Sequence, residues 1–315
     1  MKRFKSILLV DDQDIHGEAA LRRAAALARQ NDARLTVVAV VEDIPRDMRM
    51  LITTITPREV MNLVVAERQE QLEQFVAPIR HDDIRLGTTV LSGTPFLEII
   101  REVLRKKHDL VVMTAERSGG LTEQLFGSTS LHLMRKCPCP IWVLKHQPRE
   151  RFERIIAAVD PDPDDQVKNA LNAKILDLAT SLAEQEQSEL HIVHVWSFAG
   201  IESGRRYGLP DRQAEQCLEA VRGQRRNDLD ALLGRYVLAH LNHRVHLKQG
   251  NAGIVIPELV RAAQVELIVM GTVCRTGLPG FFIGNTAETI LQQVDCSVLT
   301  VKPEGFLSPV TLGAS

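Results

Sequence analysis

The chain contains one pattern of residues twice, and this internal repeat limits its fold more than any other feature. Gly93 and Gly250 lie 157 positions apart, and the same spacing separates Lys145 from Lys302. An offset that holds over more than fifty residues indicates a duplicated structural unit. The first strands of the two halves, which end at Asp12 and Asp160, are 148 positions apart, so the second copy is longer in its early part.

The length agrees with two copies, because 315 residues correspond to about two domains of roughly 150 residues each. We predict a first domain over residues 1–147, a second over 152–304, and a tail over 305–315. The linker is short, so the two domains should pack as neighbours.

Each half alternates short apolar runs with helical patterns. Continuous apolar runs of this kind indicate parallel strands that are covered on both faces by helices. The fold class we predict is therefore α/β, with two tandem, doubly wound, five-stranded parallel sheets related by a pseudo-two-fold. The predicted strands cover residues 7–10, 34–41, 88–91, 109–113 and 140–145 in the first half, and 154–159, 189–196, 244–249, 266–270 and 297–302 in the second.

Composition excludes several classes of function. The 38 Lys and Arg against 40 Asp and Glu give a formal charge of -2, so no overall basic field attracts nucleic acid. No apolar run approaches the roughly 20 residues that span a bilayer. Five cysteines make an odd number without a disulfide framework, which is typical of a reducing compartment. We therefore expect a cytoplasmic protein.

A glycine-containing loop in the second half resembles a phosphate-binding loop. Gly271, Gly277 and Gly284 would let the backbone adopt positive φ values and approach an anion closely. Asn285 and Thr286 begin the next helical pattern, where free N–H groups and the helix dipole favour negative charge. The loop fits neither the Walker pattern nor the glycine pattern of dinucleotide folds, and its spacing alone leaves a plain tight turn equally open.

The residues of this loop resemble a motif of a known protein family. The loop is similar to the nucleotide signature of universal stress proteins, Gly-x2-Gly-x9-Gly-Ser/Thr, with Cys274 at the second glycine. The first half has "CPCPIWVLK" before its end, and the family has a similar segment leading into its last strand. Over nearly its whole length the chain resembles the tandem, E-type members. The resemblance implies a domain fold like that of adenine nucleotide alpha hydrolases.

The resemblance also implies nucleoside contacts from the residues that end the first and second strands. The favoured site is in the second half, and its implied residues are Asp160, Val195, Gly271, Gly277, Gly284, Asn285 and Thr286. The corresponding residues of the first half are Asp12, Val40, Gly127 and Ser128. There Thr114 and Arg117 replace both early glycines, and we expect their side chains to crowd the phosphate path.

Other residues of chemical interest have plainer interpretations. We predict no metal site, since His240, His243 and His246 lie where a helix gives way to a strand and should be exposed around a turn. Cys137 and Cys139 should pack structurally. The pattern over residues 59–79 predicts a helix whose Val60, Leu63, Val64, Leu72, Phe75 and Val76 belong to the core.

The function predicted on these grounds is a stress-response binding protein that holds ATP or another adenine nucleotide in its second half and is not an enzyme. Two alternatives stay open. One is a nucleotide-free scaffold or carrier of a small apolar ligand, for which the apolar cluster at residues 48–52 is a candidate. The other is a weak ATP-hydrolysing enzyme.

The last strand of each half carries apolar side chains along its length. In the family, single-domain members are expected to dimerise along this edge, and a duplicated chain can satisfy the contact internally. We therefore predict an intramolecular domain pair with both last strands at the interface, and a homodimer of whole chains remains open.

Overall fold

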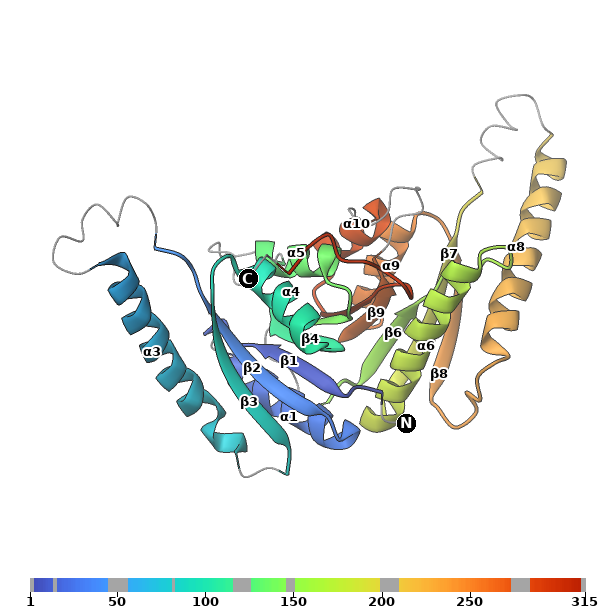
Figure 1. Cartoon of the computed structure of the whole chain (residues 1–315). Coiled ribbons are helices and arrows are strands. Elements are labelled where there is room, and N and C mark those ends of the chain that lie inside the picture. The colour runs from blue at the N-terminus through green and yellow to red at the C-terminus, as the bar shows by residue number, and fades with distance from the viewer. Residues whose placement is uncertain are drawn as a thin grey trace.

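The structure is a computed structural model, which describes residues 3–13, 16–44, 56–80, 83–115, 126–145, 151–198, 210–272 and 284–312. Strands and helices alternate through both halves (Figure 1). The first half contains β1 (Ser6–Val10), α1 (Gly17–Asn31), β2 (Arg34–Val41), α3 (Pro57–Val76), the 3-10 turn η1 (Ala77–Ile79), β3 (Arg85–Ser92), α4 (Pro95–Lys106), β4 (Leu110–Thr114), α5 (Ser128–Lys136) and β5 (Ile141–Leu144). The second contains β6 (Arg154–Ala158), α6 (Gln166–Glu186), β7 (Glu189–Trp196), α8 (Asp211–Leu233), β8 (His243–Gln249), α9 (Ala252–Ala262), β9 (Leu267–Gly271), α10 (Asn285–Gln293) and β10 (Ser297–Val301).

The ten strands form one sheet in the order β3-β2-β1-β4-β5-β10-β9-β6-β7-β8. Within each half all neighbouring strands are parallel, and the order within the second half is the mirror sequence of the first. Among the strands that the structure describes, the only antiparallel contact is between β5 and β10, the last strands, where Trp142 faces Leu299. The predicted fold class and the predicted position of the last strands are thereby confirmed.

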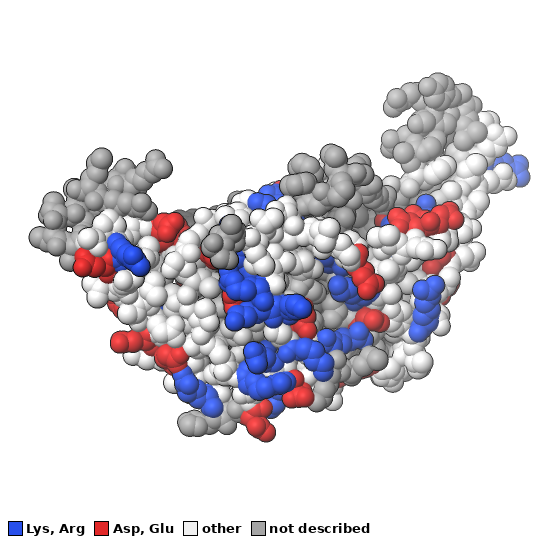
Figure 2. Space-filling model, in the orientation of Figure 1, with Lys and Arg blue, Asp and Glu red and all other residues white. Residues whose placement is uncertain are grey.

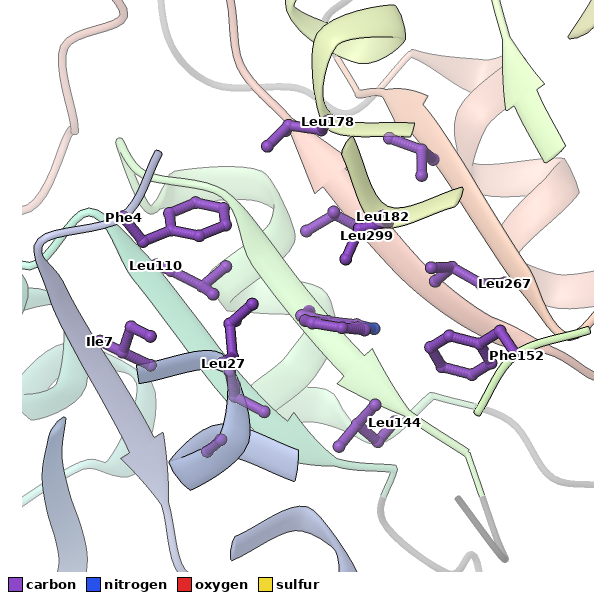
Figure 3. Close-up of a cluster of buried hydrophobic side chains, with 14 of the residues drawn as sticks. Phe4, Ile7, Leu27, Leu110, Leu144, Phe152, Leu178, Leu182, Leu267 and Leu299 are labelled. Atoms are coloured by element: carbon purple, nitrogen blue, oxygen red, sulfur yellow. The ribbon is translucent and has the colours of Figure 1, made fainter. Parts of the chain in front are cut away.

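The helices cover both faces of the sheet, and equivalent helices of the two halves share a face. One buried cluster includes Leu21 of α1, Leu72 of α3, Leu182 of α6 and Leu229 of α8. The other is formed with α4, α5, α9 and α10. A two-fold axis perpendicular to a sheet keeps equivalent elements on the same face, so this distribution agrees with the antiparallel join. Figure 3 shows that the first cluster is continuous across the join, from Phe4 and Ile7 to Leu182 and Leu267.

Local sequence explains where several helices begin and end. α3 begins with a capping box, in which the Thr56 hydroxyl accepts a hydrogen bond from the N–H of Glu59 and the Glu59 carboxylate accepts one from the N–H of Thr56. α8 was predicted to run to about His240 but ends at Leu233, where Gly234 is its C-cap. α9 was predicted to start late or kink because of Pro257, yet it begins at Ala252, capped by the Asn251 side chain.

The prediction for the core face of α3 is wrong in its first half. Leu72 and Val76 are fully buried as predicted, whereas Leu63 is 64% exposed and Val64 is 39% exposed. Figure 1 shows the reason, because the N-terminal end of α3 leans away from the sheet while its C-terminal end lies against it.

Aromatic and charged side chains join the halves on the α1 and α6 face. The Arg23 guanidinium lies 3.9 Å from the ring centroid of Phe152 and 5.5 Å from that of the buried Trp142. Its Nη1 is 2.5 Å from Glu186, and that carboxylate also accepts a hydrogen bond from the backbone N–H of Phe152. Because the ion pair is largely shielded from solvent, it fixes the relative position of α1 and α6.

Residues 303–312 continue from β10 over the helices of the first half. Val310 is buried in the cluster that contains α4 and α5, and Arg101 of α4 donates a hydrogen bond to the carbonyl of Thr311 at 3.4 Å. The C-terminal end lies beside α4 and α5 in Figure 1. The tail therefore adds a second connection between the halves.

Two lysines at equivalent positions after the last strands have different surroundings. The buried Lys145 ammonium donates to the carbonyl of Val294 at 2.8 Å and lies 3.4 Å from the Asp295 carboxylate. Lys302 is also buried, but among the described residues its Nζ has no hydrogen-bond partner. Burial lowers the pKa of Lys302 to about 8.

We expect the lowered pKa of Lys302 to make the stability of the folded protein depend on pH in a distinct way. Below pH 8 both folded and unfolded chains carry this proton, so the cost of burying the charge is fully present. Between pH 8 and 10.5 the folded chain releases the proton while the unfolded chain keeps it, so stability rises with pH. Lys302→Met should stabilise the fold by up to about 3 kcal/mol at pH 7 and remove this rise.

The measurement is urea denaturation of both proteins from pH 7 to 10.5, followed by circular dichroism. The difference between them isolates Lys302, because other titrating groups contribute to both. Lys145→Met is the matched control and should destabilise, since it leaves the carbonyl of Val294 and the Asp295 carboxylate without their ammonium partner. A destabilised Lys302→Met would contradict the interpretation.

Candidate functional site

The strand order places the predicted nucleoside contacts of the second half at one edge of the sheet. The order reverses between β6 and β9, and ligands of open α/β sheets bind at such switch points, beyond the carboxyl ends of the strands. Asp160 follows β6, Val195 lies near the end of β7, and Gly271 ends β9. Since β6 pairs with both β7 and β9, these three residues share the same edge.

The loop between β9 and α10 is closed at its base. The N–H of Gly284 donates to the carbonyl of Thr272 at 3.1 Å, and the Thr272 hydroxyl donates to the carbonyl of Met134 in α5. Gly284 is the N-cap of α10 and has no side chain to cap the first N–H groups, while Asn285 and Thr286 are exposed. An exposed helix N-terminus thus lies at the loop base. Gly277 and Cys274 lie outside the described residues.

The physical reason given for the loop glycines is wrong at two positions. Gly284 has φ -63° and ψ 140°, and Gly271 likewise lacks a positive φ. Gly271 is explained by close packing, because a Cβ there would lie 2.8 Å from Cδ2 of Leu171 in α6. Positive φ values occur instead at Gly93 and Gly250, the equivalent turns after β3 and β8, with φ 130° and 143°. The sequence has a glycine at this position in both halves, and that repetition could have indicated the positive φ values.

Asp160 is held by two side chains of α6 that the sequence analysis did not single out. The Lys168 ammonium lies 2.8 Å from one Asp160 carboxylate oxygen and 3.3 Å from Asp162. The Asn172 side chain accepts from the N–H of Asp160 and donates to its carbonyl, both at 2.9 Å. Lys168 and Asn172 are four residues apart on one helical face, a spacing that could have identified them. A ligand that contacts Asp160 therefore also meets Lys168.

A buried histidine lies behind this carboxylate. His194 of β7 donates from Nδ1 to the carbonyl of Val159 at 3.2 Å, and the same nitrogen is 3.7 Å from Asp160. Burial lowers the pKa of His194, partly opposed by the Asp160 carboxylate. In the first half the equivalent carbonyl, that of Asp11, accepts instead from the Arg68 guanidinium at 3.1 Å, which also pairs with the Asp11 carboxylate at 2.7 Å. The carbonyl at this backbone position therefore accepts a hydrogen bond from a histidine in the second half and from an arginine in the first.

In the first half the equivalent of Gly271 is Thr114, which is buried. Its hydroxyl lies 2.9 and 2.8 Å from the two carboxylate oxygens of Asp12. The Thr114 side chain thus engages the carboxylate that the resemblance implies as a nucleoside contact, and the expectation that it crowds the phosphate path stays a prediction. Gly127 is the N-cap of α5 and Ser128 its first residue.

The two valines implied as nucleoside contacts occupy similar places. Val40 and Val195 are both partly buried and pack against the same cluster, on the face covered by α4, α5, α9 and α10. Arg117 lies outside the described residues.

The three histidines near the start of β8 have separate partners. His240 lies 2.9 Å from Glu184, and His243 contacts the carbonyl of Leu241. His246 stacks on His191 with ring centroids 5.1 Å apart. His243 and His246 are half-buried in β8, so their expected exposure was wrong. In the described ranges no three His, Cys, Asp or Glu side chains are grouped as a metal site would require.

Charges of both signs are mixed over the surface. Figure 2 shows basic side chains gathered around α4 with acidic ones beside them. On that helix Arg101 pairs with Glu98 at 2.5 Å and Arg105 pairs with Glu102 at 2.7 Å. Within the part of the chain that the structure describes, no helix is long and apolar enough to cross a membrane.

Two doubly wound parallel units, each with an exposed helix N-terminus beside its switch point, define a tandem α/β protein. The chain belongs to the universal stress protein family, whose model matches residues 3–145 and 151–302. The predicted tandem, E-type organisation is confirmed by full-length similarity to relatives of that type.

Universal stress protein E of Salmonella typhi is 30% identical over 318 residues, which covers 99% of this chain and 98% of the relative. Universal stress protein E of Escherichia coli K12 is 29% identical over 314 residues, with 99% and 98% covered. Among solved structures, a putative universal stress protein of Pseudomonas aeruginosa has a TM-score of 0.70 at 21% identity, covering 97% of this chain and 95% of that one. The structural likeness supports the fold.

We predict that Gly271→Ala destabilises the protein by about 1 kcal/mol, since the new methyl group meets Leu171, whose flexible end can move aside at some cost. Gly87→Ala in β3 is the matched control, because a Cβ there meets nothing within 4 Å. That substitution should be neutral or slightly stabilising. Thermal unfolding by calorimetry measures both, and equal effects would contradict the packing explanation for Gly271.

Proposed function

We propose that this member of the family is a cytoplasmic stress-response binding protein that holds ATP or a related adenine nucleotide in its second half. In this proposal the phosphates lie against the Gly271–Thr286 loop, with contributions from Gly277, Gly284 and Asn285, and the nucleoside lies near Asp160 and Val195. The protein acts by binding rather than by turnover. The domain division at 1–147, 152–304 and 305–315 is part of the same proposal.

The observation that carries the proposal is the contrast between the two strand-end carboxylates. Asp12 is engaged by the buried Thr114 hydroxyl, which belongs to the residue equivalent to Gly271. Asp160 is paired with the Lys168 ammonium, whose side chain is 18% exposed. A nucleotide at this edge of the second half thus meets a carboxylate for its hydroxyl or amino groups and a cation for its negative charge.

The arrangement of α10 is compatible with binding in the second half, although α5 presents a similar N-terminus in the first. The exposed N-terminus of α10 presents Asn285 and Thr286 at the loop base, where free N–H groups attract phosphate oxygens. Thr272 closes this loop with Gly284 and is itself held by α5 of the first half. The first half therefore contributes to positioning the site even though it is the less favourable half for binding.

The alternative of a small apolar ligand has one observation in its favour. A groove of about 380 Å³ between α4, α5 and the C-terminal tail is lined by Leu97, Arg101, Lys136, Pro309, Val310 and Thr311. The sequence suggested residues 48–52 as the place for such a ligand. These residues do not line this groove and lie outside the described residues. Native mass spectrometry of the purified protein would show nucleotide, an apolar molecule or neither.

Calorimetric titration with ATP tests the nucleotide proposal. Gly284→Val should weaken binding at least tenfold, because its side chain stands where phosphate oxygens approach the first N–H groups of α10. Valine is compatible with the φ of -63° at this position, so we expect the variant to fold.

Gly127→Val is the matched control at the N-cap of α5, where φ is -65°, and it should leave binding nearly unchanged. Circular dichroism verifies folding of both variants. Loss of binding only in Gly127→Val would assign the nucleotide to the first half. An absence of heat with the wild-type protein would favour the nucleotide-free scaffold.

A further inference from the structure

Two cysteines of the first half lie in direct contact. Cys137 is the C-cap of α5 and Cys139 precedes β5, with only Pro138 between them. Their sulfur atoms are 3.5 Å apart, and the side chains are buried, Cys137 completely and Cys139 with 9% exposed. The sequence pattern suggested ordinary packing for this pair. The sulfur contact places it one small displacement from a disulfide.

The unpartnered lysine of the second half lies beside these thiols. Lys302 interacts electrostatically with Cys137, and its ammonium is 4.8 Å from the ring centroid of Phe306. Its counterpart Lys145 has the Asp295 carboxylate, and the residue equivalent to Asp295 in the first half is Pro138. The Cys-Pro-Cys segment therefore removes the acid that the pseudo-two-fold would supply. Lys302 is left with a thiol in place of a carboxylate.

This arrangement gives the two thiols different roles. The thiolate is the reactive form of cysteine, and a neighbouring cation favours it. The hydrogen bond to Cys137 and burial raise the pKa of Cys139 well above its ordinary value, so Cys139 keeps its proton and can donate it toward the Cys137 sulfur. Because the pKa of Lys302 is about 8, its side chain carries a proton near neutral pH and supplies this cation.

The C-terminal tail lies over the lysine that interacts with Cys137. The tail covers Lys302 through Phe306, which is half-buried, while the adjacent Leu307 is 83% exposed. The described part of the tail makes few hydrogen bonds: the N–H of Phe306 donates to the carbonyl of Pro303, that of Val310 donates to the Ser308 hydroxyl, and the carbonyl of Thr311 accepts from Arg101. Segments with few hydrogen bonds open at low cost in free energy. A molecule as small as hydrogen peroxide needs only a limited opening.

We propose that Cys137 and Cys139 form a redox site that hydrogen peroxide oxidises to a disulfide, with the Lys302 ammonium as the cation that favours the thiolate of Cys137. Nothing in this inference depends on nucleotide binding.

The chemistry is balanced in two steps. Cys137 releases its proton to solvent, and the thiolate attacks one peroxide oxygen, so that an S–O bond forms, the O–O bond breaks, and the leaving hydroxide takes up a proton as water. Cys139 then attacks the sulfenic sulfur of Cys137, which forms the S–S bond and releases a second water with the proton of Cys139. The two thiols are oxidised by two electrons, and peroxide is reduced to two molecules of water.

The experiment uses the full chain with Cys217→Ser and Cys274→Ser, so that Cys137, Cys139 and Cys296 remain. Intact mass after treatment with hydrogen peroxide should fall by about 2 Da, and peptide mapping should find Cys137 joined to Cys139. Cys296 is an internal control, since burial raises the pKa of its thiol to about 12. In the additional variant Cys139→Ser, Cys137 should gain about 16 Da and react with a sulfenic-acid probe.

The role of Lys302 is tested by the rate of oxidation against pH. Lys302→Met should slow disulfide formation at pH 7 at least tenfold and shift its pH dependence upward, whereas Lys145→Met should not slow it. Lys302→Met is expected to fold well, so a slower reaction would not reflect unfolding. Equal rates in Lys302→Met and the parent protein would overturn the assignment of this lysine.

Two results would overturn the redox site as a whole. One is an unchanged mass at a peroxide concentration that oxidises the exposed Cys217 of the wild-type protein. The other is a disulfide that forms only in urea, which would show that the folded chain keeps the pair out of reach.

Discussion

The antiparallel contact between β5 and β10 determines the arrangement of everything else in this protein. Val143, Trp142 and Ile141 face Val298, Leu299 and Thr300, and all six are buried. The contact covers the two sheet edges that would otherwise present unpaired backbone groups. It also places the two halves about a pseudo-two-fold, so that equivalent helices share a face and one apolar cluster runs through both.

The symmetry of this scaffold contrasts with the chemistry at its equivalent positions. Thr114 binds Asp12, whereas Gly271 leaves room for the Leu171 side chain. Lys145 has a carboxylate partner, and Lys302 has thiols nearby. The core strands are almost fully buried, and close packing allows them few changes. Residues at strand ends and helix starts contact solvent or the other half, so the copies could diverge there while the fold was kept.

Equivalent residues of the two halves also differ where the halves contact each other, and not only at the strand ends. Thr272, at the base of the second loop, is held by the carbonyl of Met134 in the first half, and Lys302 of the second half lies beside Cys137 of the first. Neither half is therefore complete alone. A duplicated chain can develop such unequal contacts, because its two copies always meet the same partner and need not remain identical.

The sequence by itself determined the repeat and the fold class, because these depend on apolar periodicity and on spacing, which are properties of the chain. Its motifs showed the resemblance to the family, and that resemblance implied the position of the last strands. The sequence also predicted which strand-end residues share an edge. Only the tertiary structure decided that Gly271 is required by Leu171 rather than by backbone strain, that Lys168 and Asn172 hold Asp160, and that Lys302 faces a pair of thiols. Each of these depends on the distance between atoms from different elements, often from different halves, and a one-dimensional pattern carries no such distances.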